Sequence, residues 1–262
     1  MTPYNYDRFS RLIKVPQGVM LVTGPTGSGK TTTLYAALGE LAKPNVNVIT
    51  VEDPVEKNIE GINQCQVNAK AGMTFAAALR SILRQDPDIV MVGEMRDQET
   101  AEIAIRAAIT GHMVLSTLHT NDAASTITRL VDMGVAPYMV ATSLIGIVAQ
   151  RLCKVVCNEC KTPRMSTPEE NELLGITESA TIYDACGCPK CNNTGYTGRT
   201  AIHEILLCTH EMASLIAADG KVDAISSLAK EQGCKLLRDN VAELVLEGRT
   251  TLDELVKLTF AV

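Results

Sequence analysis

The sequence predicts an α/β fold with a mostly parallel sheet, followed by a cysteine-bearing module and a helical subdomain. Short runs rich in Val and Ile alternate with longer helical stretches over the first 150 residues. This alternation is typical of parallel strands joined by right-handed crossover helices. Cysteine, proline and glycine become frequent between residues 153 and 199, and helical patterns separated by glycines follow. These composition changes indicate where one part of the chain gives way to the next.

Four buried strands are expected in the first part of the chain. Each is a short apolar run bounded by Gly, Pro or Asp, which suits a sheet covered on both faces. The expected strands are 18–23, 46–51, 89–92 and 113–117. The segments between them favour helices, because their apolar residues recur with a helical period. These expected helices are 30–42, 73–84, 97–110 and 121–133.

The rest of the chain is predicted to be mainly helical outside the cysteine-rich stretch. The expected helices there are 168–174, 210–218, 222–232, 234–247 and 251–259. We therefore predict three domains: a chemical core at 1–150, a tetracysteine module at 151–200 and a C-terminal helical subdomain at 201–262.

Composition excludes several classes of protein. The net charge is −6, so electrostatic binding to the phosphates of a nucleic acid is not expected. Aromatic residues make up 3%, with no Trp, so stacking of nucleic-acid bases on aromatic side chains is not expected either. No apolar run approaches 18 residues free of charge, so no membrane-spanning helix is expected. The first residues have no basic segment followed by an apolar one, so no secretory signal is expected either.

A phosphate-binding loop is indicated by GPTGSGKT at 24–31, which fits G-x-x-x-x-G-K-[ST] between an expected strand and an expected helix. Its glycines let backbone N–H groups converge on anionic oxygens, and the helix adds the positive end of its dipole. Lys30 is expected to reach the β- and γ-phosphates, and the Thr31 hydroxyl to coordinate Mg²⁺. The expected nucleotide-binding residues are Gly24, Pro25, Thr26, Gly27, Ser28, Gly29, Lys30, Thr31 and Thr32.

Acidic residues follow two of the expected strands, at the edge of a parallel sheet where ligands bind. Glu94 follows 89–92 and is the first choice for orienting or deprotonating an attacking water. Glu52 and Asp53 follow 46–51 and are expected to act on Mg²⁺ through its water shell, or to share the role of base. The alternative is that such acids are helix caps or solvated turns, which is the favoured interpretation for Glu56.

Two of the four histidines flank the strand expected at 113–117. His119 follows it, on the nucleotide side, where it could sense a γ-phosphate. His112 precedes it and is better placed for a structural or subunit contact. A structural role is the alternative for both, since a lone histidine is usually a satisfied structural residue.

Two C-x-x-C pairs lie 27 residues apart, formed by Cys157 with Cys160 and Cys188 with Cys191. Each pair can place two thiolates on one tetrahedral Zn²⁺, and four protein ligands make the site structural. Two disulfides or a thioredoxin-like redox pair are the alternatives, and Cys186 is a competing ligand. The remaining cysteines are expected to be ordinary buried thiols: Cys65, Cys153, Cys208 and Cys234.

With these motifs in view, the sequence resembles the secretion ATPase superfamily of type II secretion and type IV pilus assembly over nearly all of its length. The matching motifs are the Walker A TGPTGSGKTT (23–32), the Asp box VITVEDPVE (48–56), the Walker B-like RQDPDIVMVGEMRD (84–97), the His box TGHMVLSTLHT (110–120) and the tetracysteine CNEC/CPKC. The tetracysteine is typical of the assembly and secretion branches and is absent from the retraction branch. Segments 72–88 and 128–144 look most like pilus assembly ATPases, with type II secretion ATPases close behind.

The resemblance implies a RecA-like core that forms a homo-hexamer, binds ATP, Mg²⁺ and Zn²⁺, and works on an inner-membrane platform protein from the cytoplasmic side. The acidic net charge and the scarcity of aromatic residues argue against a nucleic-acid partner. Full-length members carry N-terminal domains, one of which contributes arginines to the nucleotide pocket, so this chain looks like the C-terminal ATPase portion. Arg80, Arg84 and Arg96 could reach a neighbouring phosphate or serve as ordinary ion-pair partners. A nucleotide-gated switch without sustained turnover is the main alternative to a motor.

Overall fold

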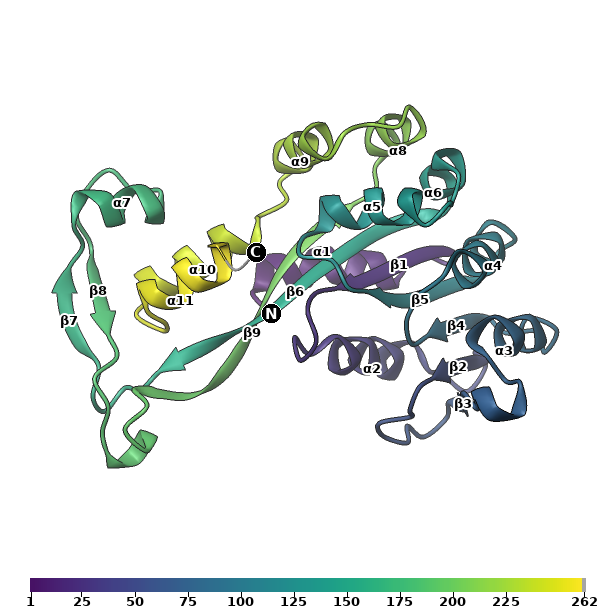
Figure 1. The fold of residues 1–262 in the computed structure, drawn as a ribbon, viewed down its shortest axis with the longest axis horizontal. Helices are drawn as coiled ribbons and strands as arrows, with labels where there is room; N and C mark the ends of the chain where they lie inside the picture. Colours follow the sequence, from purple (N-terminus) through teal and green to yellow (C-terminus); the bar gives the residue numbers. More distant parts are fainter. Residues whose placement is uncertain (261–262) are drawn as a thin grey trace. The chain divides into compact units, whose positions relative to one another are not determined.

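The computed structural model describes residues 1–260, which form two compact units (Figure 1). The core unit contains residues 2–149 and 205–234, and the cysteine unit contains residues 150–204 and the segment from Lys235 onward. The chain passes between the units within strands β6 (Leu144–Val156) and β9 (Tyr196–Leu207). The helical segment after residue 204 is therefore divided between the units, whereas the three predicted domains keep it whole. The division into 1–150, 151–200 and 201–262 stays a prediction.

A seven-stranded sheet in the order β3-β2-β4-β5-β1-β6-β9 organises the core unit. Adjacent strands from β3 to β6 run parallel, with Gly18 opposite Met113 and Val48 opposite Ile89. Every residue of β1, β2, β4 and β5 is buried, as the continuous apolar runs predict. The first five strands are β1 (Gly18–Thr23), β2 (Val48–Glu52), β3 (Asn63–Gln66), β4 (Ile89–Val92) and β5 (Met113–Leu118). The predicted α/β fold with a mostly parallel sheet is confirmed.

Short polar side chains fix the starts of several helices in the core unit. Thr74, Asp97 and Asp122 each accept a backbone N–H three residues later, at 3.2, 2.8 and 2.7 Å. Because each capping residue lies close after a strand or turn, each helix starts at a fixed point next to the sheet. The helices are α1 (Pro3–Ile13), α2 (Lys30–Leu41), α3 (Phe75–Ile82), α4 (Gln98–Ile109), α5 (Ala123–Asp132), α6 (Pro137–Ser143), α8 (His210–Ala217) and α9 (Val222–Glu231).

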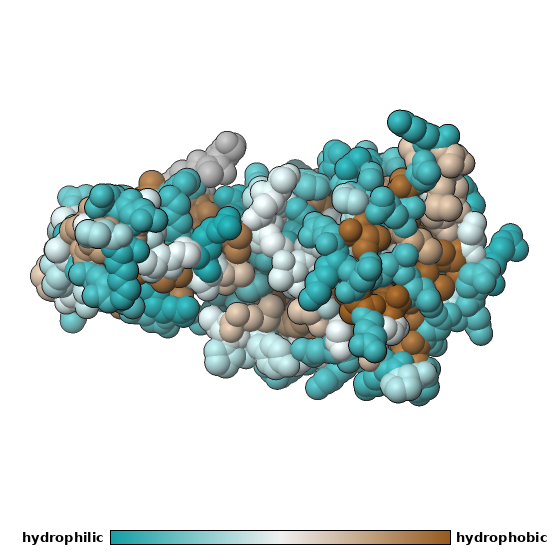
Figure 2. All heavy atoms as spheres, turned by 90° about the horizontal axis from the view of Figure 1, so that it is seen from below, coloured by the Kyte–Doolittle hydropathy of each residue, from teal (hydrophilic) through white to brown (hydrophobic). Residues whose placement is uncertain are grey.

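One apolar core cluster lies between β1, β4, β5 and the helices α1 and α2. Met20 and Val22 of β1 belong to one buried cluster with Leu34 and Leu38 of α2. On the face drawn in Figure 2, brown apolar residues gather among teal hydrophilic ones in the right-hand part of the picture. Half-buried apolar residues pack against the same cluster from outside, among them Leu41, Val46, Ile59 and Ile62.

The cysteine unit combines a small hairpin with three helices. Strand β7 (Thr162–Met165) pairs antiparallel with β8 (Thr181–Asp184). Arg164 binds Glu170 of α7 at 2.7 Å and Asp184 of β8 at 2.9 Å, which ties helix and hairpin together. The helices are α7 (Pro168–Leu174), α10 (Leu237–Leu246) and α11 (Leu252–Phe260). The last two residues of the predicted 201–262 subdomain lie outside the described residues.

Some boundaries and elements differ from the sequence-based expectations. The second strand ends at Glu52, so that residue belongs to the strand instead of following it. Strands β3 and β6–β9 and helices α1 and α6 were not predicted. Helix α1 has a low apolar content, and β3 reads NQCQ, so neither carries the apolar signal of a buried element.

Within residues 1–260, each helix is too short or too polar to cross a bilayer.

His203 makes the stability of the cysteine unit sensitive to acid. Its side chain is buried, 4% exposed, and burial lowers its pKa to about 4 from 6.5. Between these two pH values the unfolded chain binds a proton that the folded chain does not, so stability falls as pH falls from 6.5 through 4. The loss reaches about 3 kcal/mol.

Urea unfolding between pH 7 and pH 4 checks this expectation. His203→Gln should lose less stability over this range than the unsubstituted protein, whereas substitution of the exposed His210 by Asn should leave the slope unchanged. Equal slopes for His203→Gln and the unsubstituted protein would contradict it.

Candidate functional site

The loop between β1 and α2 forms one end of the site. Gly27 and Gly29 have φ of +78° and +86°, a conformation that a residue with a Cβ adopts only with strain. Gly29 is also the N-cap of α2, so the loop and the start of the helix are continuous. Lys30 is buried, and its Nζ donates to the carbonyl oxygens of Gly24 at 2.9 Å and Pro25 at 3.1 Å. Burial lowers the pKa of Lys30, while the nearby Glu94 carboxylate opposes that shift.

A pocket of about 360 Å³ opens beside this loop at the carboxyl ends of β1, β2, β4 and β5. Its size falls within the usual range of small-molecule sites. Its lining brings together Thr26, Gly27, Gly29, Lys30, Thr31, Thr32, Glu52, Asp53, Glu94 and His119, with Leu34, Pro54, Glu56, Phe75, Met91, Gly93 and Thr117. Three predicted binding residues lie outside the lining. Gly24 and Pro25 face Lys30 through their carbonyls, and Ser28 is buried in the loop.

Glu94 lies at the centre of a cluster of charged side chains. Its Oε1 is 2.5 Å from Nη2 of Arg96, and its Oε2 is 3.6 Å from Nε2 of His119. The Glu94 side chain is 15% exposed and the other two are more than half exposed. Hydrogen bonding and charge from Glu94 raise the pKa of Arg96. The carboxylate therefore has one oxygen near the Arg96 guanidinium and the other near the His119 imidazole, and it faces the same pocket as Lys30.

Glu52 is held far more tightly than Glu94. It is 3% exposed and accepts hydrogen bonds from the Thr50 hydroxyl at 2.5 Å and the Gln64 amide at 3.0 Å. The Tyr35 phenol donates to its other oxygen. Three donors satisfy this buried carboxylate, as burial requires. Glu52 therefore presents a fixed negative charge at the wall of the pocket.

The two acids that follow Glu52 are exposed at the mouth of the pocket. Asp53 is close enough to Arg96 to contribute to raising the pKa of that guanidinium. Glu56 accepts a hydrogen bond of 3.3 Å from the hydroxyl of Thr31. The prediction that Glu56 is only a solvated turn residue therefore missed its contact with the threonine expected to coordinate Mg²⁺.

Two glutamines of the edge strand β3 anchor the segment that carries these acids. Gln64 donates to the carbonyl of Lys57 at 3.1 Å and accepts from the backbone of Ile59 at 2.7 Å. Gln66 accepts from the backbone of Val55 at 3.2 Å. Sequence reasoning missed both glutamines, because a polar strand gives no apolar signal. The run NQCQ between two loops was the available clue.

The other residues singled out from the sequence, His112, Arg80 and Arg84, lie outside the pocket lining. Nδ1 of His112 is 2.9 Å from the carbonyl of Ala107, at the far end of β5, which fits its structural alternative. Arg80 pairs with Glu99 on α4. Arg84 is exposed and forms no ion pair among residues 1–260.

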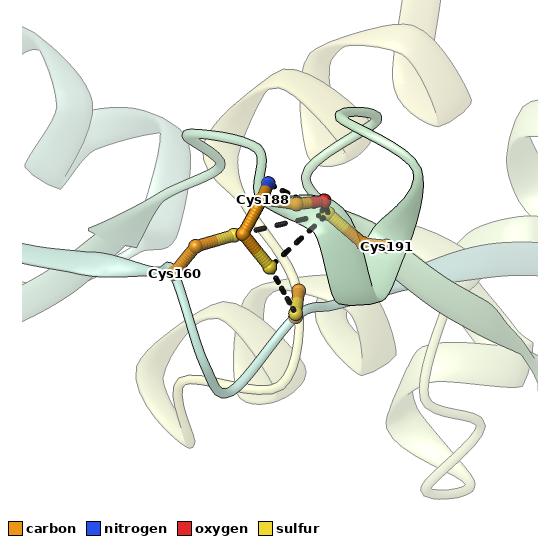
Figure 3. A group of neighbouring side chains, drawn as sticks. Cys160, Cys188 and Cys191 are labelled. Carbon is orange, nitrogen blue, oxygen red and sulfur yellow. Dashed lines mark hydrogen bonds between the residues drawn. The ribbon is translucent and has the colours of Figure 1, made fainter.

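Four cysteines form the second candidate site, in the cysteine unit (Figure 3). The sulfurs of Cys157, Cys160, Cys188 and Cys191 all lie within 4.8 Å of one another. Three of the separations are 3.8 to 3.9 Å. A tetrahedral zinc with bonds of about 2.3 Å sets its sulfurs about 3.8 Å apart, so the four thiols could hold one metal ion.

Backbone N–H groups surround this cluster. Gly187 donates to Sγ of Cys160, and Cys188 and Gly195 donate to Sγ of Cys191, each at 3.2 Å. Burial raises the pKa of Cys191, but the N–H groups of Cys188 and Gly195 and the neighbouring thiols outweigh it and lower the pKa to about 6. Burial raises the pKa of the adjacent Cys160 to about 12, so the low value belongs to one thiol of the pair. Such donors stabilise thiolates, the form that binds a metal.

The other cysteines lie outside the cluster. Cys186 is exposed, and its sulfur is 3.2 Å from the hydroxyl of Thr162. All nine cysteines are free, so the alternative of two disulfides is not found. Cys153 and Cys234 are buried as predicted, whereas Cys65 and Cys208 are only half-buried.

Comparison with known proteins identifies the family to which this chain belongs. Residues 1–257 match the model of the family described as type II/IV secretion system protein. The type II secretion system ATPase E of Vibrio cholerae serotype O1 is 50% identical over 99% of this chain and 52% of its own length. The type IV pilus assembly ATPase PilB of Thermus thermophilus is 49% identical over 98% of this chain and 29% of its own. This chain thus spans about half or less of the length of these relatives.

A solved structure of the pilus retraction motor PilT with bound ADP has a similar fold. Its TM-score is 0.74 at 31% identity, and the match covers 96% of this chain and 64% of the other. The Legionella pneumophila ATPase DotB shares the fold with a TM-score of 0.71 at 24% identity, over 98% of this chain and 63% of its own.

Proposed function

Because the chain belongs to the type II/IV secretion system protein family, we propose that it binds and hydrolyses Mg–ATP at the pocket beside the 24–31 loop. The observation that carries this proposal is the convergence of Lys30, Thr31 and Glu94 on one pocket. Relatives named as ATPases and the ADP-bound PilT structure support it. The glycine-rich loop and the start of α2 are the reason to place phosphates here, since N–H groups and the helix dipole favour anions at such a position.

Each residue has a defined task in this proposal. Lys30 leaves the carbonyls of Gly24 and Pro25 to bind the β- and γ-phosphates, and the loop N–H groups bind the remaining oxygens. Thr31 and the acids near it would hold Mg²⁺, which supplies charge neutralisation at the phosphates. Glu94 orients the attacking water and takes its proton. His119, 3.6 Å from Glu94 in the same pocket, would respond to the γ-phosphate.

The cysteine cluster is proposed to bind one structural Zn²⁺. The sulfur separations and the three N–H donors support this assignment. All four ligands come from the protein, so the site leaves no position for a substrate. Its task is then to hold together the two C-x-x-C turns, at 157–160 and 188–191, and the segments that contact them.

At the level of the whole machine, we propose a homo-hexamer that acts on an inner-membrane platform protein from the cytoplasm. Its work is the assembly of a type IV pilus, with pseudopilus assembly in type II secretion as the second candidate. Near-equal identities to relatives of both kinds support the two candidates alike. Titrating the platform protein of each machine against the ATPase rate distinguishes them, because only the cognate partner should change that rate.

Lys30→Ala is expected to weaken ATP binding by about 100-fold or more, since it removes the one buried cation of the phosphate loop. Isothermal titration with Mg–ATP measures the affinity. The matched control is substitution of the exposed Lys70 by Ala, which should bind ATP like the unsubstituted protein. Unchanged affinity in Lys30→Ala would place the nucleotide elsewhere.

A further inference from the structure

Tyr35 joins the phosphate-loop helix to the acidic segment of the pocket. It lies on α2 four residues after Thr31, so both side chains share one face of the helix. Its phenol donates to the Glu52 carboxylate and accepts a hydrogen bond of 3.2 Å from the backbone N–H of Glu56. One hydroxyl therefore contacts both ends of the segment 52–56.

This segment is held from two sides. Gln64 and Gln66 hold it on the side of β3, through Glu52, the backbone of Val55 and, one residue past the segment, the carbonyl of Lys57. On the side of α2, the contacts are those of Tyr35 and the 3.3 Å bond from Thr31 to Glu56. The Thr31 contact joins two groups that Mg²⁺ would also engage, so Tyr35 is the anchor on α2 that nucleotide binding leaves in place.

A tyrosine suits this position for a physical reason. A phenol donates one hydrogen bond and accepts another at the same oxygen, and both are used here. Burial, followed by the bond to Glu52, raises the pKa of Tyr35, so the hydroxyl keeps its proton at neutral pH. Phenylalanine keeps the ring and loses both hydrogen bonds.

We propose that Tyr35 is a positioning residue that holds the acids of the 52–56 segment at a fixed distance from Thr31, and thereby sets how strongly Mg²⁺ assists ATP binding and turnover. The proposal rests on the proposed function of the pocket. Tyr35 does not line the pocket, so it acts through Glu52 and Glu56 and touches no reacting atom.

Tyr35→Phe is expected to lower kcat about tenfold and to raise the half-saturating Mg²⁺ concentration by a similar factor, the effect of losing a hydrogen bond to a charged group. ATP affinity in EDTA should stay unchanged, because the phosphate loop is intact. The measurements are the steady-state rate and fluorescence titrations of ATP at a series of Mg²⁺ concentrations. The titrations report on Tyr35 even if turnover is slow.

The control variant is Tyr4→Phe, which removes a phenolic hydrogen bond to Gly233 in the same unit and away from the pocket. It should change neither readout. Gln64→Leu releases the segment from the β3 side and should reproduce the Mg²⁺ effect even if Tyr35→Phe folds poorly.

Two results would overturn the proposal: an unchanged Mg²⁺ dependence in both Tyr35→Phe and Gln64→Leu, or an equal loss of ATP affinity with and without Mg²⁺. Failure of the proposed function looks different. The unsubstituted protein would then bind no ATP in a Lys30-dependent way, whatever the Tyr35 variant does.

Discussion

Glu94→Gln is expected to reduce ATP turnover by about 100- to 10,000-fold, the usual contribution of a positioned general base, while ATP still binds. The carboxylate is the only acid of the pocket that contacts both Arg96 and His119 among the described residues. Glutamine keeps the size of the side chain and loses the negative charge that would accept a proton. Single-turnover hydrolysis and nucleotide titration separate the two effects.

The matched control is Glu60→Gln, at an exposed acid outside the pocket, which should turn over like the unsubstituted protein. This experiment also separates a motor from a nucleotide-gated switch. A switch binds ATP without sustained turnover, so the unsubstituted protein would turn over slowly and Glu94→Gln would change that low rate little.

If the unsubstituted protein turns over ATP and Glu94→Gln does so equally fast, the general base is another residue. Asp53 is then the next candidate, because it is exposed in the same pocket.

Removal of the proposed zinc is expected to unfold the two C-x-x-C knuckles, residues 157–160 and 188–191. Structural zinc contributes on the order of 10 kcal/mol in small zinc domains, more than most folds can lose. The knuckles also hold the turn between α10 and α11, because Lys161 donates to the carbonyl of Gly248 at 2.8 Å and Val156 to that of Arg249 at 2.9 Å. Chelation should therefore speed hydrogen exchange at residues 157–195 and at this turn.

A matched pair of cysteine variants tests the assignment of ligands. Cys191→Ser should abolish the single bound zinc measured by metal analysis, and it should lower the melting temperature. Cys186→Ser should keep one zinc per chain, since its sulfur lies outside the cluster. Retention of zinc in Cys191→Ser, or its loss in Cys186→Ser, would contradict the proposed ligand set.

The sequence predicted best those features whose residues are neighbours along the chain. Strands β1 and β4 have their predicted bounds, since each is a continuous apolar run ended by a glycine. The glycine-rich loop between β1 and α2 was located for the same reason, as its motif falls within eight residues, and its binding of phosphate stays a prediction. The spacing of each C-x-x-C pair likewise predicted the cysteine cluster, because a knuckle is a local structure.

Features that depend on the order of strands could not be predicted. The Tyr35–Glu52–Gln64 network joins α2, β2 and β3, and nothing in the local sequence says that β3 pairs with β2. The assignment of α10 and α11 to the cysteine unit depends on contacts such as Lys161 to Gly248, made across 87 positions of the chain. In each case a polar side chain forms a hydrogen bond with a residue that is distant in the sequence and close only in the folded chain.

The most direct test of the central claim is Mg²⁺-dependent ATP hydrolysis over a series of protein concentrations, with Lys30→Ala measured in parallel. We predict a rate per subunit that depends on Lys30 and rises with concentration, because in the proposed homo-hexamer each subunit would complete the site of its neighbour. No hydrolysis above that of Lys30→Ala at any concentration, with ATP still bound, would contradict the claim that this chain is a hydrolase and favour the nucleotide-gated switch.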